Sequence, residues 1–554
     1  MVRERPDLRP YAGKSLTVIA WIWARTVKSP NPAFGQVDVP LASTFLLSTK
    51  PGKEAYIEPV IENRGYRFTV KVGAPRNADA LKNGTRAGKA QDFLCLMSGV
   101  PVARSYVRDE GKAGRLGARL MAVVAEGDGG RVYLSPNDVD DVPAMRPDEA
   151  SVVVDARSTF LSGLTPTRAM ITGGVCSAYG LTTWGSLFSP RQVIALTTFS
   201  DLVLEAREQV KRDALAVGLP DDSKALATGG SGLTAYADAI AAYLAFAVDK
   251  GANYWSSVCA WHITRDGIVS TFGRQAIPMV FDYAEANPLS SSSGNWDLGI
   301  EQAGKMLEAL GMGAPGMALQ ADAASQTTST DRVVSTDPPY YNNIGYADLS
   351  DFFYVWLRRS LKQVFPSLFA TLAAPKAEEL VATLYRHGSK EKAEAFFLDG
   401  MTQAMHRLAD QAHPAFPVTI YYAFRQSEST SSHGVSNTGW DTFLAAVIAA
   451  GLAISGTWPV RTEYTGNLKK NISALASSIV LVCRKRSADA TSATRREFAA
   501  ALKSELPNAL TQLQRGNFPP STSPRRRSAR AWPSTPVARK CSTPRARRSR
   551  FAKR

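Results

Sequence analysis

The tetrapeptide Asp337-Pro338-Pro339-Tyr340 carries the residue types best suited to chemistry in this sequence. The carboxylate of Asp337 and the backbone carbonyl of Pro338 could accept the two hydrogens of an amino group on an aromatic ring. Accepting these hydrogens returns electron density to the nitrogen and stabilises the positive charge that develops as a methyl group arrives. The tetrapeptide therefore predicts methyl transfer to an exocyclic amine.

The other members of the tetrapeptide suit the same chemistry. Pro338 and Pro339 restrict the backbone, so the acceptors would be held in place before reaction. Tyr340 offers a flat face to a base, which must be flipped out of a duplex to be reached. The alternative is a proline-rich turn capped by Asp337. We favour the catalytic interpretation because this tetrapeptide is rare by chance and follows an apolar strand.

The elements expected around the tetrapeptide alternate between strands and helices. Residues 333–336 predict a strand, and open α/β sheets place ligands at the carboxyl ends of strands. Further strands are expected at residues 418–424, 452–460 and 478–483, and helices at residues 350–361, 377–385, 390–411 and 440–450. The alternation predicts an α/β fold with a mainly parallel sheet. The last two strands lack an intervening helix and could pair antiparallel.

The preceding part of the chain has a different pattern. Strands are expected at residues 15–27, 41–47 and 66–72, because β-branched and aromatic residues are concentrated there. Ser189 followed by Pro190 predicts a capped helix that runs to about residue 217. A second helix is expected at residues 235–249.

The charge of the chain is unevenly distributed. The formal net charge is +16, but residues 519–554 hold 12 lysines and arginines and no acidic residue. The remaining 518 residues carry 53 basic and 49 acidic side chains. The basic excess therefore lies mostly in the tail and does not indicate a nucleic-acid-binding surface over the whole protein. The tail should be disordered. It could be a nucleic-acid-binding arm, but an out-of-frame translation of GC-rich DNA is preferred.

Composition also bounds the cellular setting. No apolar run approaches the roughly 18 residues of a membrane helix, and the first residues do not form a secretory signal. The five cysteines are widely spaced and odd in number, which disfavours a disulfide framework. These features predict a cytoplasmic protein with no membrane partner. The cysteines are Cys95, Cys176, Cys259, Cys483 and Cys541.

Residues 335–361 (STDPPYYNNIGYADLSDFFYVWLRRSL) resemble the catalytic loop and following helix of amino-methyltransferases. More narrowly, the chain resembles the bacterial family of adenine-specific DNA methylases that contain a zinc ribbon. The similarity spans most of residues 15–517, and the family motif is matched at Asp337, Pro338, Pro339 and Tyr340. Asn342 stands where the family usually has Asp.

This resemblance implies a class I methyltransferase-like (Rossmann-like) fold and S-adenosylmethionine as methyl donor. It also implies DNA as partner, the adenine N6 amino group as acceptor, and a role in restriction-modification or defence, with other proteins of such systems as further partners.

Two departures from the family pattern bear on the cofactor and the metal. The family's Asp-Pro-Phe-x-Gly-Gly-Gly segment, expected to bind the cofactor, has no equivalent, and residues 171–175 (ITGGV) predict only a turn. The chain is therefore expected to be a copy truncated at its N-terminus, with unknown cofactor-binding residues. Ser29, Phe34 and Ser98 replace ribbon cysteines, leaving Cys95. One thiolate cannot complete a four-ligand zinc site, so no zinc is expected.

Other candidate residues have plainer interpretations. The five histidines match no metal spacing, and we expect surface or hydrogen-bonded roles for them. Trp261, Tyr283 and Trp296 could line a base pocket, but core packing is favoured. Arginines 358, 359, 484 and 486 could touch phosphates, although solvated element ends are favoured. The histidines are His262, His387, His406, His413 and His433.

The expected organisation has six parts. They are a strand-rich region with the degenerate zinc ribbon (1–134), a linker (135–165), a mainly helical region (166–330), the C-terminal half of a methyltransferase domain (331–486), a C-terminal helix (487–518) and the disordered basic tail (519–554). The first functional hypothesis is an incomplete DNA adenine methyltransferase. The alternatives are a catalytically inactive remnant with weak nucleic-acid binding, or methylation of an amino group in RNA or protein.

Overall fold

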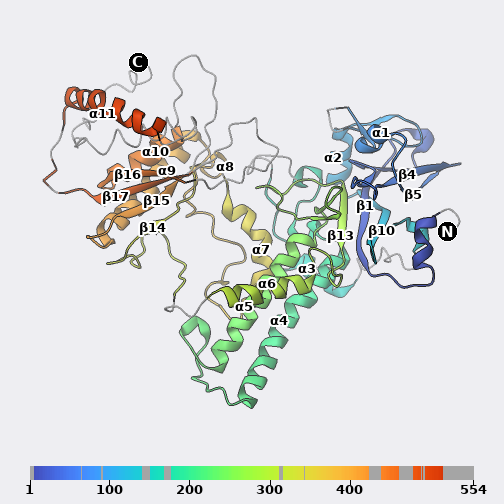
Figure 1. Ribbon diagram of the computed structural model, residues 1–554, viewed down its shortest axis with the longest axis horizontal. Coiled ribbons are helices and arrows are strands. Elements are labelled where there is room, and N and C mark those ends of the chain that lie inside the picture. The colour runs from blue at the N-terminus through green and yellow to red at the C-terminus, as the bar shows by residue number, and fades with distance from the viewer. Residues whose placement is uncertain are drawn as a thin grey trace. The chain divides into compact units, whose positions relative to one another are not determined.

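The protein divides into two compact units in the computed structural model (Figure 1). Unit 1 consists of Met1–Gly316 and Tyr346–Lys376, and unit 2 consists of Met317–Gly345 and Ala377–Arg554. The structure describes residues 5–63, 65–88, 92–139, 150–167, 176–310, 316–341, 344–422, 438–460, 478–487, 489–490 and 493–515. Residues 171–175, Asn342 and the basic tail, for which we made predictions, lie outside these ranges.

Unit 1 contains several antiparallel sheets. A five-stranded sheet has the order β10-β9-β1-β13, with β2 also paired to β1. Three smaller sheets are β3-β4-β5, β6-β7-β8 and β11-β12. The strands are β1 (Val18–Lys28), β2 (Asp38–Pro40), β3 (Leu46–Ser48), β4 (Ala55–Glu62), β5 (Gly65–Val72), β6 (Arg86–Ala87), β7 (Asp92–Leu94), β8 (Pro101–Val102), β9 (Gly117–Gly127), β10 (Gly130–Leu134), β11 (Ala260–His262), β12 (Gly267–Val269) and β13 (Asp282–Ala286).

The helices of unit 1 are centred on two long neighbours. Helices α4 and α5 pack on each other, and α7 packs against both (Figure 1). Ser189 caps α4 by accepting a hydrogen bond from the Gln192 amide, which confirms the predicted start of this helix. The helices are α1 (Ala78–Asn83), α2 (Arg104–Lys112), α3 (Ser151–Ser158), α4 (Pro190–Ala216), α5 (Leu233–Tyr254), α6 (Trp296–Ala309) and α7 (Tyr346–Leu361).

Several elements of unit 1 do not fit the regions expected from the sequence. Strand β13 lies in the region expected to be mainly helical, but it pairs antiparallel with β1. Helix α3 lies within residues 135–165, where a linker was expected. Helix α7 is the next helix after the tetrapeptide among the described residues, but it belongs to unit 1, where its residues Phe352 and Trp356 are fully buried.

Unit 2 is a four-stranded sheet with helices. The strand order is β14-β15-β17-β16. Helices α9 and α10 pack on each other and contribute Phe397, Met401, Trp440 and Phe443 to the core over the sheet. The elements are β14 (Ser335–Thr336), α8 (Leu384–His387), α9 (Lys390–Gln411), β15 (Val418–Tyr422), α10 (Thr438–Ala449), β16 (Leu452–Val460), β17 (Ser478–Lys485) and α11 (Arg495–Arg515).

The prediction of a mainly parallel sheet is wrong for the described strands. Strands β14 and β15 form the one parallel pair among them, whereas β17 pairs antiparallel with both β15 and β16. The reason is that β17, the last strand, lies between β15 and β16 and runs opposite to both, so each of its pairings is antiparallel. The predicted antiparallel pairing of these last two strands is confirmed.

Two further predictions need correction. The helix expected at residues 377–385 is absent there except for its end, which lies in α8. Instead, this segment is tied to the loop after β14 by the Ala382 amide, which donates to the Tyr341 carbonyl at 2.6 Å. The predicted strand at 41–47 is interrupted, since residues 41–45 are buried or half-buried irregular chain between β2 and β3. No helix in the described ranges is long and apolar enough to span a membrane.

Candidate functional site

The tetrapeptide begins where β14 ends. Thr336, the last residue of β14, is paired in parallel with Ile420 of β15. Because parallel neighbours end at the same edge of a sheet, Asp337 and the last residue of β15, Tyr422, lie at one edge. The structure therefore brings the sequence-predicted residues to the edge where open α/β sheets bind ligands.

Asp337 is an exposed residue with a tuned carboxyl group. The Tyr340 hydroxyl donates a hydrogen bond to this carboxylate, which favours its charged form. Partial burial of the carboxyl has the larger effect and raises the pKa of Asp337 above its ordinary value. The side chain is thus open to solvent and not packed in the interior, and its raised pKa makes it a better proton acceptor.

Tyr340 rests on a cluster of aromatic side chains. Its ring meets Tyr422 edge-to-face, with centroids 5.4 Å apart and an interplanar angle of 74°. Tyr422 stacks on Phe443 at 3.8 Å and is tilted against Trp440 at 5.8 Å. Tyr422, Phe443 and Trp440 are almost fully buried, whereas Tyr340 is half-buried. The cluster therefore packs against the Tyr340 ring through Tyr422, and Tyr340 remains partly accessible to solvent.

The loop that carries the tetrapeptide is anchored just after it. The Tyr341 amide donates to the Tyr422 hydroxyl at 3.1 Å, and the Tyr341 ring packs edge-to-face on Phe397 at 5.2 Å. Burial raises the pKa of Tyr422, so its hydroxyl stays neutral and can accept this bond. Pro338 is buried as well. These contacts hold the loop in one position, as a pre-formed site requires.

Reasoning from sequence missed the residues that support the site. Tyr422, Trp440 and Phe443 were assigned to a strand and a helix without a role at the tetrapeptide. A signal was present, because aromatic residues gather at the end of VTIYY and in TGWDTF. Asp441 follows Trp440, and partial burial raises its pKa. None of these residues could be tied to the tetrapeptide without the strand pairing.

The other aromatic candidates take part in packing. Tyr283 is 5% exposed, and Trp296 stacks on Phe199 with centroids 4.4 Å apart. The indole nitrogen of Trp261 donates to the Leu47 carbonyl at 2.8 Å. Trp261 also lines a cavity in unit 1.

The arginine candidates of α7 have protein partners. Arg359 forms two hydrogen bonds of 2.9 Å with the carboxylate of Asp201 on α4. Arg358 donates to the Phe369 carbonyl at 3.2 Å. Both side chains are thus engaged within unit 1.

Two residues of the region expected from the resemblance to be a degenerate zinc ribbon lie together in the core. Ser29 is 5% exposed, and its hydroxyl donates to the Cys95 sulfur at 3.6 Å. Burial raises the pKa of Cys95, but hydrogen bonds from Ser98 and Ser29 outweigh it and leave the pKa lowered. Among the described residues, no group of three or more His, Cys, Asp or Glu could hold a metal ion. The expectation of no zinc stays a prediction.

Comparisons of the chain with protein-family models, curated proteins and solved structures found no match. Function must therefore be argued from the residues and their geometry.

Proposed function

We propose that this chain is an S-adenosylmethionine-dependent DNA adenine N6-methyltransferase, with Asp337 to Tyr340 as its catalytic residues. The observation that carries the proposal is an exposed carboxylate at the carboxyl end of a parallel strand, beside a half-buried tyrosine. The sheet of unit 2 supports it too. Strands β14, β15 and β16 share one direction, as the pairings through the reversed β17 require.

The proposed chemistry follows from the positions of these groups. Asp337 and the Pro338 carbonyl accept the hydrogens of the adenine amino group, while the exposed part of Tyr340 stacks on the base. The bound S-adenosylmethionine supplies the methyl group. The amine nitrogen would bond to the methyl carbon as the carbon–sulfur bond of the donor breaks, and S-adenosylhomocysteine would leave. One amine proton would pass to Asp337, whose raised pKa favours proton acceptance.

The test combines cofactor binding with methyl transfer. The family's Gly-rich cofactor segment has no equivalent in this chain, so we expect labelled S-adenosylmethionine to bind through other residues. With the cofactor bound, the full chain is expected to methylate duplex DNA that contains adenine. Asp337→Ala should lower the transfer rate by about 100-fold or more, because a transition-state partner is lost. Asp399→Ala, which removes an exposed carboxylate on α9 of the same unit, is the matched control and should keep the wild-type rate.

Each alternative has its own outcome in this test. Failure of the full chain to bind the cofactor would favour a catalytically inactive remnant. Transfer to RNA or protein but not to DNA would favour the other acceptor class. Full activity of Asp337→Ala would show that the tetrapeptide is not the catalytic site.

A further inference from the structure

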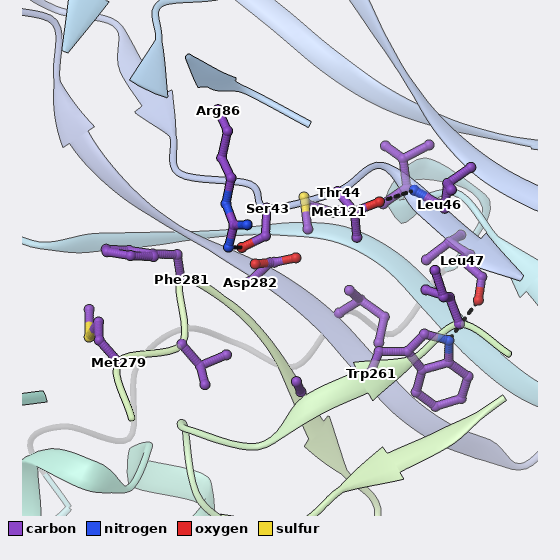
Figure 2. A pocket seen from close by; sticks show the side chains of 15 residues that line it. Ser43, Thr44, Leu46, Leu47, Arg86, Met121, Trp261, Met279, Phe281 and Asp282 are labelled. Atoms are coloured by element: carbon purple, nitrogen blue, oxygen red, sulfur yellow. Dashed lines mark hydrogen bonds between the residues drawn. The ribbon is translucent and has the colours of Figure 1, made fainter. Parts of the chain in front are cut away.

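Unit 1 contains a cavity of about 280 Å³ that methyl transfer at the tetrapeptide does not use (Figure 2). Its walls are mostly apolar and come from separate strands, including β1, β3, β4, β9 and β11. Binding pockets for drug-sized ligands begin at about 300 Å³, so this volume suits a ligand built on a single bicyclic ring. The apolar wall residues include Ile22, Leu46, Leu47, Ile57, Met121 and Trp261.

One carboxyl group faces this apolar space. Asp282, the first residue of β13, receives hydrogen bonds from the backbone amide and the hydroxyl of Ser43. The Ser43 hydroxyl in turn accepts a bond of 2.7 Å from the Arg86 guanidinium. Figure 2 shows Asp282 and Ser43 close together, with the end of Arg86 directed toward them. The position of the carboxyl is thus defined by its neighbours.

The electrostatic balance favours a neutral ligand part inside the cavity. Among the described residues lining it, Asp282 and Arg86 are the charged ones, and their charges are opposite. Burial raises the pKa of Asp282 to about 6, although Ser43 and Arg86 both oppose the shift. A carboxyl with such a pKa can accept a hydrogen bond near neutral pH and can donate one when protonated.

We propose that the cavity binds an adenine nucleotide, with the base against Asp282 and the phosphate on Arg86. Adenine presents an amino donor beside a ring-nitrogen acceptor, which is the pattern that a carboxyl group can pair with. The Trp261 side chain supplies an apolar aromatic wall, because its indole N–H is already bonded to the Leu47 carbonyl. Arg86 is an exposed residue with further donors for a phosphate.

This site goes beyond the proposed methyl transfer and does not depend on it. The first test titrates the full chain by calorimetry with adenosine 5′-monophosphate, adenosine and purine riboside, which lacks the amino group. We expect the monophosphate to bind about tenfold more tightly than adenosine, and adenosine about tenfold more tightly than purine riboside. Equal affinities for adenosine and purine riboside, or no binding of the monophosphate at millimolar concentration, would overturn the proposal.

Variants locate the binding. Asp282→Leu should abolish binding of the monophosphate, whereas Asp337→Ala should leave it unchanged, so a failure here is separate from a failure of the methyltransferase proposal. Arg86→Gln alters an exposed side chain, so it tests the site even if Asp282→Leu does not fold. It should equalise the affinities for the monophosphate and adenosine. Arg67→Gln, at a half-buried arginine on β5, is its control. Wild-type binding by folded Asp282→Leu, or an unchanged preference in Arg86→Gln, would refute the assignment.

A competition experiment identifies the source of the nucleotide. The competitor is an oligothymidylate with one central adenine, compared with the same strand without adenine. Displacement of the monophosphate by the first strand alone identifies an unpaired adenosine of a nucleic acid as ligand. Displacement by neither strand identifies a free nucleotide, and equal displacement by both contradicts recognition of adenine.

Discussion

Two effects of opposite sign determine the pKa of the Asp337 carboxyl group. Partial burial raises its pKa, and the hydrogen bond from the Tyr340 hydroxyl counteracts part of that rise. The same tyrosine is held by Tyr422 through an edge-to-face contact. The Tyr340 side chain therefore moderates the pKa of the carboxyl and also supplies the aromatic surface beside it.

This coupling predicts a pH effect for Tyr340→Phe. Removing the hydroxyl removes a donor to the charged form, so the pKa of Asp337 should rise further above its ordinary value. The carboxyl would then be protonated over a wider range of acidic pH. Carbon-13 NMR of labelled aspartate, assigned by loss of the signal in Asp337→Asn, measures the shift. Tyr421→Phe is the control, and an unchanged or lowered pKa in Tyr340→Phe would disprove the coupling.

At the scale of elements, the paired ends of β14 and β15 build the site. The Tyr422 hydroxyl at the end of β15 accepts a hydrogen bond from the Tyr341 amide. The link between the two strands therefore extends from their backbone pairing into the loop that follows β14. Helix α10 supports the same tyrosine with Phe443, whose ring is stacked on it. Because each of these elements contributes a contact to one loop, a substitution in β15 should alter the position of the tetrapeptide.

We therefore expect Tyr422→Phe to destabilise the protein by about 1–3 kcal/mol, because the Tyr341 amide loses its buried acceptor. Methyl transfer should fall as well, since the loop loses an anchor. Tyr421→Phe is a matched control, because Tyr421 is 37% exposed on the same strand. Urea unfolding with the rate assay checks both effects. Equal behaviour of the two variants would argue against this anchor.

For the whole molecule, the division into two units predicts separable unfolding. A buried ion pair offers a marker for unit 1: Glu285 is 2% exposed, and Arg191 binds its carboxylate at 2.7 and 2.6 Å. Arg191→Ala would leave this carboxylate buried without its cation, which costs about 3–5 kcal/mol in comparable pairs.

Calorimetry of the full chain should show two transitions, with one of them lowered by Arg191→Ala and the other unchanged. Arg212→Ala, at an exposed position on the same helix, should move neither. A single transition that shifts as a whole in Arg191→Ala would show that the two units unfold together.

Local chemistry explains how much of the fold was readable from the sequence. Residues 390–411 and 452–460 were predicted with the bounds that α9 and β16 have, and both have strong local signals. Ser389 caps α9, as Ser189 caps α4. Residues 377–383 fail because the contact of Ala382 with the Tyr341 carbonyl replaces a helical pattern.

The sequence by itself determined the tetrapeptide, its place after a strand and the caps of the long helices, because these depend on neighbouring residues. Only the tertiary structure decided that β17 lies between β15 and β16 and that Tyr422 supports Tyr340. It alone placed Asp282 and Arg86 at one cavity. The physical reason is that such contacts join residues far apart in the chain, and no local period encodes which distant strands will pair.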